Sequence, residues 1–122
     1  MADSGSGWTV VDFERVRGDF PIRAFLAALE GRNKAEAAAH IQQAAARGNQ
    51  LREPRSKKVE GTDRLFELRS GHQLRIFYCF QPGRVIVLLD GLVKKQDRIP
   101  AGDLARVLGY QREVERRGPR AP

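Results

Sequence analysis

Cysteine is almost absent from this chain of 122 residues, in which Cys79 is the only one. A single thiol excludes an internal disulfide framework and is typical of proteins from a reducing compartment. No apolar run is long enough to cross a bilayer, and residues 1–7 are small and polar, without the basic start and apolar middle of a secretory signal. We therefore expect a cytoplasmic protein that does not bind a membrane.

Sequence patterns for metals and cofactors are also missing. The chain has no phosphate-cradling glycine motif, no nucleophile elbow and no zinc-ligand spacing. Its two histidines, His40 and His72, are isolated from other candidate ligands. We predict no metal and no small-molecule cofactor, and we expect Cys79 to be a small buried apolar side chain.

Basic residues, in contrast, are abundant. The chain carries 22 Lys and Arg against 15 Asp and Glu, which gives a net charge of +7 and an isoelectric point near 10.3. Such a surface attracts polyanions, so nucleic acid or an acidic protein is the expected type of partner. The cations are concentrated in four segments, which are residues 47–58, 69–75, 94–98 and 112–120.

Two helices are predicted in the N-terminal half. The first begins at Asp19, a residue type that caps helices, and ends at Gly31. The second covers residues 34–47, with Asn33 as its cap and Gly48 as its stop. Because their connection is short, we expect an antiparallel helical hairpin on one face of a sheet.

Strand patterns and one more helix account for most of the remaining chain. The polar segment 49–63, interrupted by Pro54, is predicted to be a loop. Strands are expected at residues 8–13, 64–70, 74–81 and 85–93, and residues 101–117 have helical spacing. We predict a single α+β domain over residues 8–117, with a small, mainly antiparallel twisted sheet, the helical hairpin on one face and a C-terminal helix. Residues 1–7 are expected to be a flexible N-terminus and residues 118–122 a disordered tail.

The strand register follows from the side-chain pattern, because residues directly opposite in an antiparallel pair share a face. A three-residue loop at Gly71 pairs Phe66 with Tyr78, Leu68 with Ile76 and Arg69 with Arg75. A two-residue loop would mix charged with apolar side chains, so the longer loop is preferred. Across the next turn, we expect Phe80 opposite Val85, Tyr78 opposite Val87 and Arg75 opposite Asp90.

This register predicts two different sheet faces. The apolar face, expected to lie under the helices, carries Phe66, Leu68, Leu74, Ile76, Tyr78, Phe80, Val85, Val87 and Leu89. The second face carries Glu67, Arg69, Arg75 and Asp90 among Phe77, Cys79, Ile86 and Leu88. A partly apolar face with a few charges is typical of a ligand groove.

The ordered segments LFELR, LRIFYCF and VIVLLDGLVKKQDRIP, followed by the last helix, also carry a family resemblance. They resemble the HigB-type branch of the RelE/ParE toxin superfamily, which includes phage-derived Gp49-like proteins. The resemblance implies a type II toxin that cuts messenger RNA in the ribosomal A site, in contact with 16S ribosomal RNA. It also implies a helix-turn-helix, HigA-like antitoxin as partner. The alternatives are a ParE-like inhibitor of DNA gyrase and an inactive remnant that only binds a partner, since fold alone does not fix function.

The resemblance also suggests site residues. It implies catalytic contacts from Arg69 and Arg75 to the scissile phosphate and from the basic pair Lys94 and Lys95, with Glu67 and Asp90 in support. Binding to messenger or ribosomal RNA is expected from Arg55, Lys57, Lys58, Arg64 and Arg98.

The sequence departs from the family pattern at two positions. Glu67 stands where RelE has a catalytic lysine, and Pro100 and Ala101 replace an expected tyrosine, for which Tyr110 is a distant substitute. The general acid and base are therefore not assigned. A structural interpretation is also open, in which Arg75 forms a cross-strand ion pair with Asp90, and Arg69 pairs with Glu67.

Overall fold

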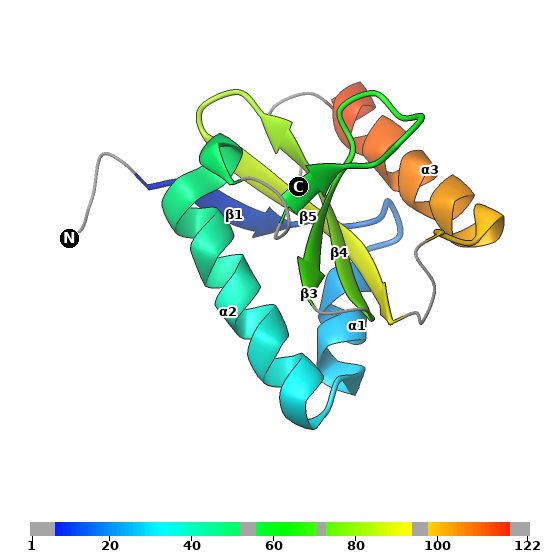
Figure 1. Ribbon diagram of the computed structural model, residues 1–122. Coiled ribbons are helices and arrows are strands. Elements are labelled where there is room, and N and C mark those ends of the chain that lie inside the picture. Colours follow the sequence, from blue (N-terminus) through cyan, green and yellow to red (C-terminus); the bar gives the residue numbers. More distant parts are fainter. Residues whose placement is uncertain (1–6, 52–55, 71–72, 94–97, 118–122) are drawn as a thin grey trace.

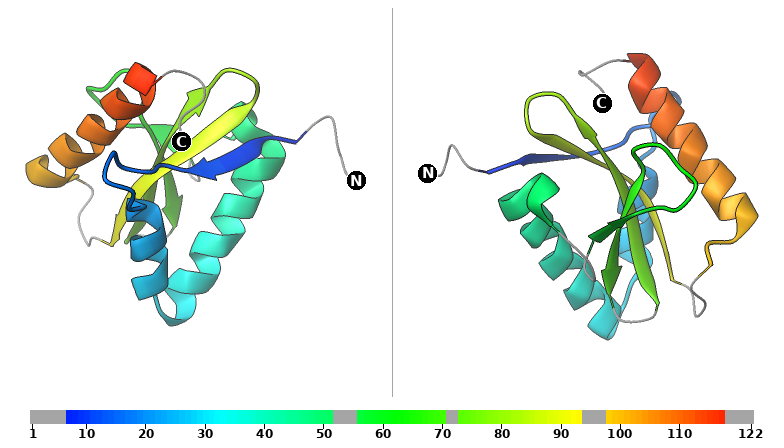
Figure 2. Two further views of the ribbon diagram at one scale, coloured as in Figure 1. Left: turned by 180° about the vertical axis from the view of Figure 1, so that it is seen from behind. Right: turned by 45° about the horizontal axis from the view of Figure 1, so that its top comes forward.

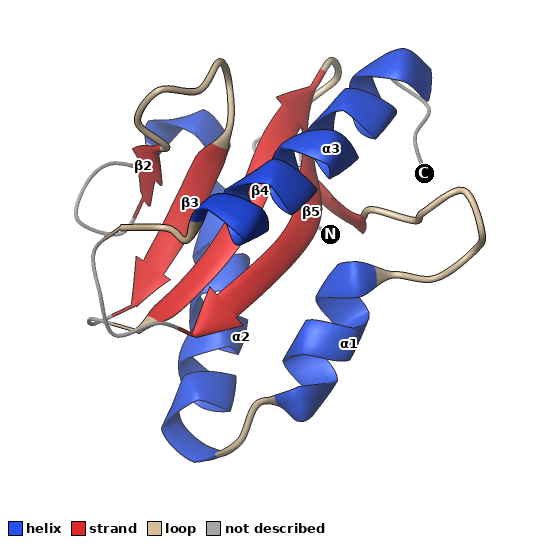
Figure 3. Cartoon of the chain, turned by 90° about the vertical axis from the view of Figure 1, so that its right-hand side faces the viewer, coloured by secondary structure: helices blue, strands red, loops and turns tan. Residues whose placement is uncertain are grey.

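The computed structural model describes residues 7–51, 56–70, 73–93 and 98–117. Its centre is a five-stranded sheet with the strand order β1-β5-β4-β3-β2. Helices α1 and α2 cover one face of the sheet and α3 covers the other (Figures 1 and 3). The elements are β1 (Thr9–Asp12), α1 (Pro21–Ala28), α2 (Gly31–Arg47), the short 3₁₀ helix η1 (Gly48–Gln50), β2 (Ser56–Lys58), β3 (Phe66–Ser70), β4 (Leu74–Gln81), β5 (Val85–Val93) and α3 (Ala101–Arg117).

The predicted fold class is confirmed, and the bounds of β4, β5 and α3 match the prediction. The β1 strand pairs in parallel with β5, whereas the other neighbouring strands pair antiparallel. Figure 2 shows β1 at one edge of the sheet with α2 close by, where the Trp8 amide donates a hydrogen bond of 2.8 Å to the Ala45 carbonyl. Residues of both α1 and α2 pack in one core cluster on the same face of the sheet, which confirms the predicted N-terminal helical hairpin on one face.

The predicted helix caps are wrong. The N-cap residues are Phe20 for α1 and Glu30 for α2, and neither makes a side-chain capping bond. The Asp19 carboxylate instead accepts a 2.9 Å hydrogen bond from Arg17 Nε, and this bond holds the pKa of Asp19 below its usual value. The Asp19 carboxylate, which the sequence suggested as a helix cap, thus pairs with arginines in the preceding turn.

Strand β2 was not predicted, because it lies inside the polar segment interpreted as a loop. Its three residues include two lysines and give little apolar alternation. The strand pairs antiparallel with β3 and forms one edge of the sheet. A short, charged edge strand discourages pairing with other chains, which explains its composition.

The predicted β3–β4 register is confirmed, but the predicted β4–β5 register is wrong. The three-residue turn Pro82–Arg84 places Phe80 opposite Ile86 and Tyr78 opposite Leu88. Gly83 (φ 86°) and Arg84 (φ 61°) are both left-handed in this turn. A bulge at Phe77/Tyr78 then shifts the register, so that Asp90 lies opposite Phe77, not opposite Arg75.

Because of this turn, each side chain in the first half of β5 lies on the face of the sheet opposite to the predicted one. Ile86 and Leu88 join the core under α1 and α2, whereas Val85, Val87 and Leu89 pack under α3 with Phe77 and Cys79. The bulge places one extra residue in β5, which shifts the alternation of its side chains between the two faces. Asp90 therefore lies on the predicted face of the sheet.

The β5 strand also contains a close approach between layers. A Cβ on Gly91 would lie 2.3 Å from Cε2 of the Phe25 ring. Glycine at this position lets α1 pack directly against the strand. Since α3 covers the opposite face, the core has one apolar layer on each side of the sheet.

Candidate functional site

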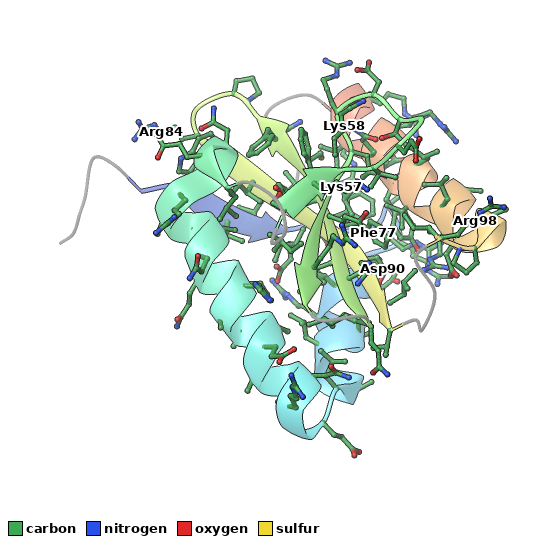
Figure 4. All side chains as sticks on the ribbon, in the orientation of Figure 1. Lys57, Lys58, Phe77, Arg84, Asp90 and Arg98 are labelled. Carbon is green, nitrogen blue, oxygen red and sulfur yellow. The ribbon has the colours of Figure 1, made fainter. Side chains whose placement is uncertain are left out.

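A row of four side-chain positions crosses the face of the sheet that α3 partly covers. Lys57 on β2 is opposite Glu67 on β3, Glu67 is opposite Phe77 on β4, and Phe77 is opposite Asp90 on β5. Figure 4 shows Lys57, Phe77 and Asp90 between the sheet and α3, on the side where Arg98 lies. Charged groups that are distant in the sequence are therefore neighbours on one surface.

A groove of about 470 Å³ opens at the end of this row nearest β2. Its polar lining comes from Lys57, Glu60, Glu67 and Arg98, and its apolar lining from Val59, Ile99 and Leu104. The segment before α3 and the first turns of that helix form one wall. A polar groove with placed charges is suited to a charged or strongly hydrogen-bonding ligand.

Arg75 and Glu67 form a buried ion pair beneath this groove. Arg75 is 1% exposed and Glu67 is 7% exposed, and Arg75 Nε lies 3.1 Å from Glu67 Oε1. Arg75 Nη1 also donates a hydrogen bond of 3.1 Å to the Leu74 carbonyl. The guanidinium thus neutralises Glu67, and the pairing differs from both ion pairs that the sequence suggested.

Asp90 is held by a residue that the sequence did not indicate, Arg106 of α3. Arg106 Nε donates a hydrogen bond of 3.2 Å to Asp90 Oδ2, and Arg106 Nη1 donates one of 2.7 Å to Asp103 Oδ1. Burial lowers the pKa of Arg106, but the bonds to Asp103 and Asp90 outweigh it, so its pKa is raised overall. The spacing of Asp103 and Arg106 predicts a helical ion pair, whereas the contact with Asp90 depends on how α3 packs.

Three cations surround the groove region without a carboxylate partner in the part of the chain that the structure describes. Lys57 lies at its edge, Arg98 is exposed beside it, and the half-buried Arg69 lies opposite Arg75. Cations that no internal acid neutralises remain available to phosphate groups. These three, with Glu67 below them, are the candidate ligand-binding set.

Other predicted site residues lie elsewhere. Lys58 is opposite Phe66, and its ammonium donates a hydrogen bond of 2.8 Å to the Thr62 carbonyl. Arg64 pairs with Asp63 at 3.4 Å and with Glu115 at 3.9 Å. The predicted site residues Arg55, Lys94 and Lys95 lie outside the described residues.

Tyr110 is also separate from the groove. Its ring packs against Phe13 with 5.0 Å between centroids, and the Arg15 guanidinium lies 5.8 Å from its centroid. Both neighbours come from the segment that connects β1 to α1. Tyr110 therefore contributes to the α3 packing, and its predicted role as a catalytic substitute has no support from its position.

The described residues contain no group of three or more His, Cys, Asp and Glu side chains that could hold a metal ion. Within the same residues, no helix is long and apolar enough to span a membrane. Cys79 is 3% exposed, as expected of a buried apolar side chain. Burial, with a smaller contribution from Glu115, raises the pKa of its thiol to about 12.

The buried thiol of Cys79 should be unreactive in the native protein. At pH 8 the folded protein should resist a thiol reagent, whereas denaturant should expose the thiol and allow complete labelling. Because the thiol pKa is raised from 9.0 to about 12 on folding, its contribution to stability is complete below pH 9 and is lost as the pH rises through 12. Rapid native labelling would contradict this. The Cys79→Ala variant is the control for the loss of stability above pH 9.

Comparison with known proteins gives one family match and a distant structural match. Residues 24–110 match the family described as phage-derived protein Gp49-like, whereas none of the curated proteins matches. The fold is similar to a chain in the crystal structure of the toxin–antitoxin complex RelBE2 from Mycobacterium tuberculosis. That match has 19% identity and a TM-score of 0.45, and it covers 78% of this chain and 100% of the other.

Proposed function

Because this chain belongs to the Gp49-like family of phage-derived proteins, we propose that it is the toxin of a toxin–antitoxin system and acts as an endoribonuclease. The observation that carries the proposal is a groove lined by the cations Lys57 and Arg98, with Arg69 two residues from Glu67 on β3 and with Glu67 paired to a buried arginine. Phosphodiester groups of RNA match this charge pattern.

Metal-free RNA cleavage needs help at three points. The 2′-hydroxyl must lose a proton, the charge on the phosphorane must be stabilised, and the leaving 5′-oxygen must gain a proton. We assign the base to Glu67, because it lines the groove and forms a buried ion pair with Arg75. Arg69 and Arg98 would stabilise the phosphorane, and Lys57, opposite Glu67 on the neighbouring strand, would protonate the leaving group.

The substrate in this proposal is messenger RNA in the ribosomal A site. The ribosome would hold the message in the in-line geometry that cleavage requires. The exposed cations Lys58 and Arg64 lie outside the groove. Arg64 is the proposed contact to 16S ribosomal RNA, and Lys58 is a proposed contact to the message. A helix-turn-helix antitoxin is the proposed partner, and a short reading frame for one beside this gene would support it.

Removal of cations that line the groove or lie beside it on β3 should abolish most of the cleavage. In a translating extract, Arg69→Ala and Arg98→Ala should each slow messenger cleavage by at least about tenfold, because each removes a charge that stabilises the transition state. The cuts can be mapped by primer extension on the ribosome. The control is Arg84→Asn, since Arg84 lies at the distant β4–β5 turn (Figure 4) and asparagine tolerates its left-handed backbone.

Two results would contradict the proposal. Equal cleavage by all three variants would exclude the groove as the active site. An intact message in cells whose growth is arrested would exclude the nuclease, and accumulation of cleaved DNA–gyrase complexes would then identify a ParE-like toxin.

A further inference from the structure

A second pocket lies on the opposite face of the sheet, between η1 and strands β2 to β4. It has a volume of about 270 Å³ and is lined by Gly48, Asn49, Leu51, Ser56, Lys57, Lys58, Phe66, Tyr78 and Phe80. The edge strand β2 separates this pocket from the groove that contains Glu67. None of the residues assigned above to catalysis lines this pocket except Lys57.

Three aromatic rings line the apolar part of this pocket. Phe66 stacks on Tyr78 with 5.6 Å between centroids, and Phe80 meets both rings edge-on at 5.2 and 5.5 Å. Tyr78 is 1% exposed, whereas Phe66 and Phe80 are half-buried and keep part of their surface open. The exposed parts of these rings provide a stacking surface for a flat ligand.

The aromatic surface is held in place from two sides. The Tyr78 hydroxyl and the Ser56 hydroxyl share a buried hydrogen bond of 2.5 Å, and the Trp8 ring packs against Phe80 with 5.4 Å between centroids. A ligand that stacks here meets rings that are already ordered. Less conformational freedom is then lost on binding.

The charge of the rim indicates what kind of ligand fits. Lys57 and Lys58 are cationic, Asn49 and Ser56 are neutral and polar, and no lining residue is a carboxylate. The groove on the other face, in contrast, is lined by two carboxylates, Glu60 and Glu67. The aromatic pocket therefore favours an anionic ligand with a flat apolar part.

We propose that this aromatic pocket binds one nucleobase of single-stranded RNA, which is an inference that rests on the proposed action on RNA. The base would stack on Phe66 and Phe80, and the adjacent phosphates would contact Lys57 and Lys58. Aromatic side chains combined with cations that follow the backbone are the usual means of binding single strands. A flat base with its phosphates matches both the apolar surface and the cationic rim.

The position of Lys57 connects the two sites. It lines both the groove and the aromatic pocket, and β2 is a three-residue strand at the edge of the sheet. An RNA strand that crosses this edge contacts cations on both sides. A base in the pocket would then fix the position of the message relative to the groove.

The experiment compares two oligomers with the full-length protein in the absence of ribosomes. One is a uridine hexamer, and the other is an abasic hexamer with the same ribose–phosphate backbone, both at the same salt concentration. Because the chain has a single tryptophan, and Trp8 contacts Phe80, fluorescence of Trp8 reports occupancy of the pocket. We expect the uridine hexamer to bind about tenfold more tightly than the abasic one.

Phe66→Leu is the informative variant, since leucine keeps an apolar side chain but removes the stacking ring. It should reduce the tenfold preference to about onefold while binding of the abasic hexamer stays unchanged. If this variant does not fold, Phe80→Leu supplies the same test. Arg84→Asn is the matched control and should keep the preference.

Equal binding of the two hexamers by the unaltered protein would overturn the proposal, and so would a folded Phe66→Leu protein that keeps the preference. If the unaltered protein shows no base preference but still cuts the message, the pocket proposal alone would be rejected. A tenfold preference that disappears in Phe66→Leu, together with an uncut message, would reject the nuclease and keep the pocket as an RNA-binding site.

Discussion

Arg75→Met should destabilise the protein by about 3–5 kcal/mol, because it leaves the Glu67 carboxylate buried without its guanidinium. The Arg75 side chain is 1% exposed and lies 3.1 Å from Glu67 Oε1. Thermal or denaturant unfolding measures the loss. Arg69→Met is the matched control, since Arg69 lies directly opposite Arg75 but is half-buried, and we expect it to cost less than about 1 kcal/mol.

The double variant Glu67→Leu/Arg75→Met should recover most of that stability. Replacing a buried ion pair by apolar side chains of similar size is often neutral, because neither charge then needs to lose its water shell. Recovery to within about 1 kcal/mol of the unaltered protein is expected. A double variant as unstable as Arg75→Met would show that the two residues do not act as a pair.

The double variant Glu67→Leu/Arg75→Met also tests whether Glu67 has a catalytic role in addition to a structural one. If Glu67 accepts the proton from the 2′-hydroxyl, the refolded double variant should cut messenger RNA at least about 100-fold more slowly. Normal cleavage by this stable double variant would assign the ion pair to stability alone. The sequence suggested direct phosphate contact by Arg75, whereas its burial favours a positioning role.

Gly48→Ala should cost about 3 kcal/mol or more, which lowers the melting temperature by roughly 10 °C. Two effects add at this residue. Its backbone has φ 54° and ψ −122°, which an L-amino acid rarely adopts, and an added Cβ would lie 2.0 Å from Cε2 of Trp8. The indole would have to move away from the end of α2.

Gly31→Ala separates the two effects. Gly31 has a similar φ of +56°, but an added Cβ there meets nothing within 4 Å. It should therefore cost only the backbone strain, about 1 kcal/mol. Equal melting temperatures for Gly31→Ala and Gly48→Ala would show that contact with Trp8 has no energetic weight.

The sequence predicted those parts of the fold that depend on local patterns. The pairing of Arg69 with Arg75 follows from alternation in two adjacent strands, and α3 follows from apolar spacing between Leu104 and Val114. The predicted β4–β5 register was wrong because the turn has three residues, one more than the predicted pairs imply, and because a bulge changes the alternation again. Turn geometry depends on backbone angles such as those of Gly83 and Arg84, which apolar spacing does not encode.

The candidate site was predictable in part. Glu67, Arg69, Arg75 and Asp90 were expected on one face, and they lie there in the structure. Their partners were not predictable, because Arg106 reaches Asp90 only through the docking of α3. Burial of Arg75 likewise depends on what covers the sheet.

The sequence by itself determined an α+β domain with a basic surface, because composition and residue periodicity act along the chain and do not depend on distant contacts. Only the tertiary structure decided which charges remain available to a ligand. Glu67 neutralises Arg75, whereas Lys57, Arg69 and Arg98 have no carboxylate partner among the described residues. An ion pair depends on distance and burial, which are fixed only when strands and helices from separate parts of the chain pack together.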